Sequence, residues 1–111
     1  MYESEQVEGS DVTIIAYGIT ARVAAYAVKQ ARQQGLKVGQ VRLITLWPFN
    51  DRLMREIADK TKAIIVAEMN LGQIAREVER FVSLPVVRVS KIGGVAHSVE
   101  DIYQAIVQER A

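Results

Sequence analysis

The chain has 111 residues, of which 50% are hydrophobic and 24% are charged, and its formal net charge is +1. These values are typical of one globular domain with one core, and the near-neutral charge argues against nucleic acid or an anionic membrane as a partner. The absence of cysteine excludes disulfides, thiolate metal sites, cysteine-ligated iron–sulfur clusters and a cysteine nucleophile within the chain, and it suits a reducing cytoplasm.

The first ten residues are mostly polar. They lack the apolar region of a signal peptide, and no apolar run elsewhere in the sequence is long enough to span a bilayer. We interpret residues 1–10 as a linker or a short edge strand, with the linker favoured, and we assign residues 11–111 to a single α/β domain.

Short apolar runs alternate with amphipathic stretches along the rest of the chain. Runs rich in β-branched residues predict strands, and apolar residues at helical spacing predict helices. The strands are expected at residues 11–17, 36–43, 63–68 and 86–89. The helices are expected at about residues 20–34, 50–60, 72–82 and from 98 onward. This order predicts right-handed crossovers and a mainly parallel sheet covered on both faces.

Thr20 and Gly35 mark the expected ends of the first helix. A threonine hydroxyl at the N-cap accepts a hydrogen bond from an orphan backbone N–H group, and glycine commonly follows the end of a helix. Small side chains at helical spacing predict a stripe that lets the helix approach the sheet closely. Its members are Ala24, Ala27, Val28 and Ala31.

The stretch at residues 63–73 is the expected centre of the domain. It begins as an apolar run of the kind that parallel sheets bury on both faces. It then reaches Glu68, Asn70 and Gly72, at the strand end where such sheets place their chemistry. Glu68 is either a general acid or base, if desolvated, or a partner of backbone N–H groups or of an arginine across an interface, which we favour. Asn70 is either a ligand-binding residue or a turn residue.

With the strands numbered along the chain, the expected order in the sheet is 2-1-3-4. The first and third strands are then neighbours whose crossovers leave in opposite directions, and ligands bind at such a switch point. Gly18 and Thr20 are expected on one side of this crevice and residues 68–72 on the other. The turn after the first strand has one glycine, so a dinucleotide fingerprint is absent, as is a P-loop. The turn at residues 91–94 binds an anion or is simply flexible, which is the commoner case.

Other polar residues have weaker claims to chemistry. His97 is the only histidine in the sequence, which disfavours a metal site. Ser98 is better explained as a helix cap than as a nucleophile. Arg42, near the end of the second strand, indicates a sheet edge or a functional rim.

Trp47, Pro48 and Phe49 stand together in the loop after the second strand. Three bulky residues in one loop either complete the end of the core or form a docking patch. We regard both interpretations as open, and the second suggests an oligomer.

Four segments taken together resemble a known family. They are residues 11–18 with 20–22, 43–49, 66–73 and 91–94. In this order they are similar to the domain that follows the pyrimidine-binding domain in the alpha subunit of 2-oxoacid:ferredoxin oxidoreductases, most of all the 2-oxoglutarate type. The resemblance extends from Asp11 to about Gln108.

The resemblance implies a transketolase C-terminal-like domain. Such a domain is a three-layer α/β/α sandwich with a mixed five-stranded sheet. Its antiparallel strand lies at one edge, and residues 5–10 or those before them are expected to form it.

The resemblance also implies a part in a larger enzyme. The parent would oxidatively decarboxylate a 2-oxoacid to an acyl-coenzyme A and pass electrons to ferredoxin, using thiamine diphosphate, magnesium and an iron–sulfur cluster, with coenzyme A as co-substrate. This chain lacks the family's Gly-Asp-Gly pyrophosphate motif, and Glu68 does not match the motif of the cofactor-activating glutamate. The domain is therefore expected to bind no cofactor and no metal. Its expected role is to contact the pyrimidine-binding domain of its own subunit and the other subunits, and to hold the oligomer together.

The residues alone leave two further hypotheses open. One is a free-standing domain that binds a small ligand, such as a nucleotide or coenzyme A, in the crevice between the first and third strands. The other is a hydrolase that uses Glu68 or Ser98.

Overall fold

The computed structural model describes residues 2–43, 51–68, 73–90 and 99–110. The strands in these ranges are β1 (Tyr2–Glu5), β2 (Val12–Tyr17), β3 (Val38–Leu43), β4 (Ile64–Glu68) and β5 (Val86–Ser90). The helices are α1 (Ile19–Gln33), α2 (Asp51–Lys60), α3 (Gln73–Phe81) and α4 (Val99–Arg110). The four predicted strands and four predicted helices are confirmed, with ends that differ by a few residues.

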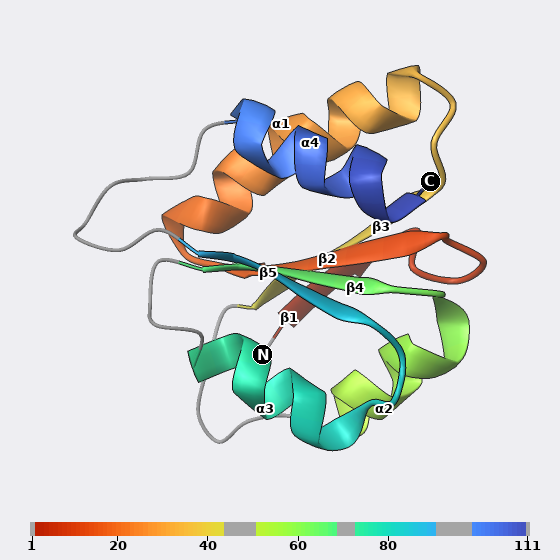
Figure 1. Cartoon of the computed structure of the whole chain (residues 1–111), viewed down its shortest axis with the longest axis vertical. Helices are drawn as coiled ribbons and strands as arrows, with labels where there is room; N and C mark the ends of the chain where they lie inside the picture. The colour runs from red at the N-terminus through yellow and green to blue at the C-terminus, as the bar shows by residue number, and fades with distance from the viewer. Residues whose placement is uncertain (1, 44–50, 69–72, 91–98, 111) are drawn as a thin grey trace.

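The strands form one sheet in the order β1-β3-β2-β4-β5. β1 runs antiparallel to β3, and the other neighbours are parallel. Figure 1 shows α1 and α4 on one face of the sheet and α2 and α3 on the other. The three-layer α/β/α sandwich and the predicted order of the four parallel strands are confirmed.

The N-terminal residues form the edge strand that was the alternative to a linker. Tyr2 pairs with Leu43 and Glu5 pairs with Gln40, so β1 is formed mainly by the residues before the range 5–10, and Glu5 is its last residue. Val7 follows it into the core on the side of α2 and α3, with 8% of its surface exposed. Backbone pairing and the buried Val7 side chain help to hold this segment, and its polar sequence signals neither of them.

The side chains of the central strands alternate between two core layers. In β4, Ile65 and Ala67 pack in the layer with α1 and α4, whereas Ile64 and Val66 pack in the layer with α2 and α3. All four side chains are 0% exposed. The prediction that this run is buried on both faces of a parallel sheet is confirmed.

Helix α1 packs on the sheet through the predicted stripe, whose members are at most 1% exposed: Ala24, Ala27, Val28 and Ala31. The predicted N-cap is wrong, because the helix begins at Ile19 and Thr20 is buried within its first turn. The N-cap is Gly18, with φ 65° and ψ −139°. Glycine adopts a positive φ without steric cost, so the chain turns straight from β2 into the helix before it reaches the threonine. Gly35, with φ 85°, follows the helix as predicted.

Three buried hydroxyl groups join the segment after β1 to the sheet. Ser10 Oγ donates to the carbonyl oxygen of Val7 at 2.6 Å and lies 3.0 Å from Thr13 Oγ1 and 2.8 Å from Thr61 Oγ1. Thr61 Oγ1 also donates to the carbonyl oxygen of Ser10 at 3.2 Å. The three polar residues are at most 9% exposed, and each hydroxyl has partners that replace water.

Gly39 in β3 lets the same segment lie against the sheet. A Cβ atom at this position would be 2.7 Å from Thr13 Oγ1 and 2.7 Å from Val7 Cα. Glycine inside a strand often marks such a close approach of another backbone. The absence of a side chain here is therefore a packing requirement.

We expect Gly39→Ala to lower the free energy of unfolding by about 1–3 kcal/mol, because the added methyl group overpacks a site bounded by backbone. Urea unfolding followed by circular dichroism measures the change. Lys37→Ala, an exposed substitution just before β3, is the control and should change the value by less than about 0.5 kcal/mol. Equal stability of the two variants would contradict the packing requirement.

Ser10→Ala is expected to lower the free energy of unfolding by about 1–3 kcal/mol. It removes one hydroxyl of a buried cluster, and the remaining hydroxyl groups lose hydrogen bonds that water cannot replace. Guanidinium unfolding monitored by tryptophan fluorescence gives the value. Ser83→Ala provides the matched control, because that serine is exposed. A loss as small as that of the control would show that the cluster does not anchor the segment.

Candidate functional site

The carboxyl ends of β2 and β4 lie side by side at the end of the sheet where the parallel strands finish. This end is called the carboxyl edge here and is distinct from the lateral edge formed by β1. Ala16 pairs with Ala67, so Tyr17 and Glu68 end the two neighbouring strands at the same level. Figure 1 shows that α1 follows β2 on one face and α3 follows β4 on the other. The predicted switch point is therefore present, and in open α/β sheets this is where ligands bind.

The structure places only part of the predicted crevice. Gly18 forms the turn after β2, and Thr20 is buried in α1. The backbone of Glu68 ends β4, but its side chain is outside the described part of the structure. The remaining candidates lie outside the described residues: Trp47, Pro48, Phe49, Asn70, Gly72, His97, Ser98 and the turn at residues 91–94. The roles predicted for them stay predictions.

Tyr17 presents an aromatic side chain to solvent at this edge. It is 41% exposed, although the five residues before it in β2 are buried. Tyrosine has a large apolar body and a hydroxyl group, and it is enriched in the centres of protein interfaces. This position suits a contact with a partner better than it suits a catalytic step.

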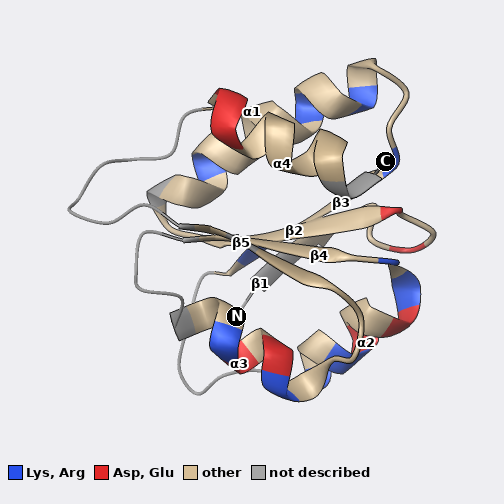
Figure 2. Ribbon diagram, in the orientation of Figure 1, with Lys and Arg blue, Asp and Glu red and all other residues tan. Residues whose placement is uncertain are grey.

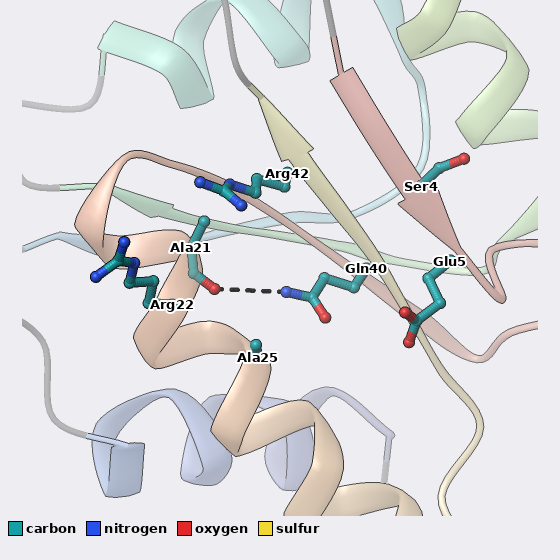
Figure 3. Close-up of a pocket in the computed structure, with 7 residues that line it drawn as sticks. All are labelled: Ser4, Glu5, Ala21, Arg22, Ala25, Gln40 and Arg42. Atoms are coloured by element: carbon teal, nitrogen blue, oxygen red, sulfur yellow. Dashed lines mark hydrogen bonds between the residues drawn. The ribbon is translucent and has the colours of Figure 1, made fainter.

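A second feature, which no motif indicated, is a groove between α1 and the β1 edge of the sheet, here called the α1–β1 groove (Figure 3). Its volume is about 380 Å³, and its lining residues are Ser4, Glu5, Ala21, Arg22, Ala25, Gln40 and Arg42. Gln40 Nε2 donates across it to the carbonyl oxygen of Ala21 at 3.5 Å. Arg42, which we predicted to mark a sheet edge or a functional rim, lies on β3, and β3 is not an edge strand because β1 pairs with it on its outer side.

Arg32 ties the β1 edge to the helix beside the groove. Its Nε and Nη2 donate to the carbonyl oxygen of Val38 at 3.1 and 2.9 Å, and its Nη1 donates to the Glu5 carboxylate. The planar guanidinium holds both partners in a fixed geometry. The carboxylate of Glu5, which lines the groove, is therefore already engaged.

The described residues do not fit a metal–pyrophosphate site. No group of three or more His, Cys, Asp or Glu side chains among them is placed to hold a metal ion. Within the same ranges, no helix combines the length and the apolar character needed to cross a bilayer. No catalytic step is assigned to the described side chains.

Comparison with known proteins identifies the family. The family model for pyruvate:ferredoxin oxidoreductase core domain II matches residues 10–102. The chain belongs to this family.

Relatives of this core domain II are larger proteins. The 2-oxoglutarate synthase subunit KorA of Methanocaldococcus jannaschii is 40% identical over 108 residues, which are 96% of this chain and 29% of that subunit. A solved 2-oxoglutarate:ferredoxin oxidoreductase from Magnetococcus marinus, with 2-oxoglutarate, coenzyme A and succinyl-CoA bound, aligns with a TM-score of 0.90 at 29% identity. That alignment covers 100% of this chain and 20% of the other.

The chain is also similar in structure to a split-gene transketolase, which was solved as an inactive tetramer of beta subunits. The transketolase aligns with a TM-score of 0.79 at 28% identity over 97% of this chain and 41% of its own. The predicted resemblance to 2-oxoacid:ferredoxin oxidoreductases and the transketolase C-terminal-like fold are confirmed. Because the chain spans only 29% of the KorA subunit, it corresponds to one domain of such a protein.

Arg32→Ala in this core domain II is expected to loosen β1 while leaving the central sheet intact, because charge-assisted hydrogen bonds to Glu5 and Val38 are lost. Amide hydrogen exchange should become about tenfold faster or more in residues 2–5. Exchange in β4 should not change. The neighbouring exposed substitution Gln33→Ala is the control, and unchanged exchange in β1 would contradict the anchoring role of Arg32.

Proposed function

We propose that this core domain II is a non-catalytic structural and assembly domain of a thiamine-diphosphate-dependent 2-oxoacid:ferredoxin oxidoreductase. The observation that carries the proposal is the family match over residues 10–102, in a chain that spans 29% of the KorA relative. The parent enzyme would oxidatively decarboxylate a 2-oxoacid to an acyl-coenzyme A and reduce ferredoxin. This domain would position its neighbours for that reaction.

The proposed partners are the pyrimidine-binding domain of the same subunit and the other subunits of the oxidoreductase. The proposed contact surface is the carboxyl edge of the sheet. β2, β3, β4 and β5 are parallel, so their carboxyl ends gather there, and Tyr17 is exposed at that edge. The antiparallel β1 has Tyr2 at the same edge, opposite Leu43.

Rigidity is what the domain would contribute. The central strands that end there are buried on both faces, and close-packed interiors have low compressibility, so they hold the surfaces around them in a fixed position. Thiamine diphosphate, magnesium and the iron–sulfur cluster would be held elsewhere in the parent, with coenzyme A as its co-substrate. Oligomeric assembly, a cytoplasmic location, the exclusion of nucleic acid and membrane partners, and the domain boundary at residue 11 stay predictions.

One observation favours an alternative function. The switch point between β2 and β4 is present, and such points bind nucleotides and related ligands in many α/β proteins. A free-standing domain that binds a nucleotide or coenzyme A in that crevice is the alternative to an assembly domain.

The assembly role is tested by mixing the purified chain with the other polypeptides of its oxidoreductase, produced without this domain. Sedimentation velocity should show a complex with a Kd at or below about 1 μM, as a specific interface of standard size gives. Tyr17→Ala should weaken this complex by about tenfold, because an aromatic anchor at the contact edge is lost. Tyr26→Ala is the matched control, since Tyr26 is exposed on α1 and away from this edge.

Failure of the wild-type chain to bind those polypeptides would contradict the assembly role. Isothermal calorimetry with coenzyme A and with thiamine diphosphate then separates the two functions. Saturable binding of coenzyme A by the chain alone, in the absence of assembly, would favour the free-standing ligand binder.

A further inference from the structure

The α1–β1 groove exists because helical cover ends before the sheet does. Val38, Gln40 and Arg42 alternate onto the α1 face of β3, and they are buried, half-buried and exposed in that order. Helix α1 lines the groove with the small side chains of Ala21 and Ala25 and with Arg22. The space that larger residues would fill is left open beside β1.

Arg22 lines the groove and is exposed, and no ion pair within the described ranges involves it. Figure 3 shows its guanidinium group on one side of Gln40 and the Glu5 carboxylate on the other side. That carboxylate is engaged by Arg32. Within the described part of the chain, no carboxylate that lines the groove therefore balances the charge of Arg22.

Helix α1 supplies no acidic residue that could pair with Arg22. Its charged residues are Arg22, Lys29 and Arg32, and Figure 2 shows only basic positions along it. Its N-cap makes no side-chain hydrogen bond, and its first turn has no carboxylate. A negative charge near a helix N-terminus stabilises the helix, and the first turn of α1 contains no acidic residue that would supply one. In α4, which packs beside α1, Glu100 and Asp101 provide acidic residues in the first turn.

We propose that the α1–β1 groove binds a carboxylate-bearing polypeptide segment of another domain or subunit of the oxidoreductase. The inference rests on the proposed assembly function and names the chemistry of one contact. Arginine presents a planar fork of donors that matches a carboxylate. Arg22 supplies this fork at the groove's open side, and Gln40 lies between it and Glu5 (Figure 3). An acidic side chain seated there would pair with Arg22, for which the described residues supply no ion-pair partner.

The groove suits a polypeptide contact because it is open to solvent where α1 meets the β1 side of the sheet, and Arg22 and Ala25 in its lining are exposed. Arginine is among the residues most enriched at energetically dominant interface positions. A segment that places its carboxylate in the groove would contact Arg22 there.

Charge reversal of Arg22 in the assembly mixture described above tests the proposal. Arg22→Glu should raise the Kd of the complex by about tenfold or more, because it places a carboxylate where one must bind. The Kd of the wild-type complex should rise with sodium chloride concentration, and that of the variant should rise less steeply. Lys29→Glu is the matched control, since it makes the same charge change on the same helix outside the groove lining, and its Kd should stay within about threefold of the wild type.

The outcomes separate this inference from the assembly function. A wild-type chain that assembles and an Arg22→Glu variant that assembles equally well would overturn the groove contact alone. Equal losses in Arg22→Glu and Lys29→Glu would also overturn it, because they indicate long-range attraction rather than a contact in the groove. Absence of any complex with the wild type would overturn both proposals. Circular dichroism and urea midpoints of both variants, expected at the wild-type value, establish that each is folded.

Discussion

The structure depends on the burial of two adjacent parallel strands, β2 and β4, on both of their faces. Ile14 and Ile15 in β2 pack into opposite core layers, as Ile65 and Ile64 do in β4. Each buried face needs its own layer of helices, and each parallel pair needs a crossover long enough to contain one. The three layers and the switch point at the carboxyl ends of the strands follow from this single requirement.

Attachment of the N-terminal segment is a second constraint, and it is met by different forces. β1 adds to the sheet through backbone pairing, Arg32 holds Glu5, and Ser10 joins Thr61 through buried hydroxyl groups. Gly39 provides the space that this arrangement needs. Few of these contacts depend on hydrophobic periodicity, so an edge strand of polar residues is stable here without an apolar pattern of its own.

The two proposed contact surfaces lie where the burial of the strands ends. At the carboxyl edge, β2 ends in the exposed Tyr17. At the β1 side, the helical layer stops short of the sheet, and the α1–β1 groove results. Both are surfaces suited to contact with other polypeptides.

The sequence by itself determined the alternation of strands and helices, the strand order of the parallel core, the alanine stripe of α1 and the family. These properties depend on residue spacing and on β-branched or small side chains, which are local and repeat with a fixed period. Only the tertiary structure decided that Tyr2–Glu5 form a strand, that Thr20 is buried instead of capping a helix, and that Arg22 and Arg42 border one groove. Each of these depends on contacts between residues far apart in the chain or on a single glycine φ angle, and neither leaves a periodic trace in the sequence.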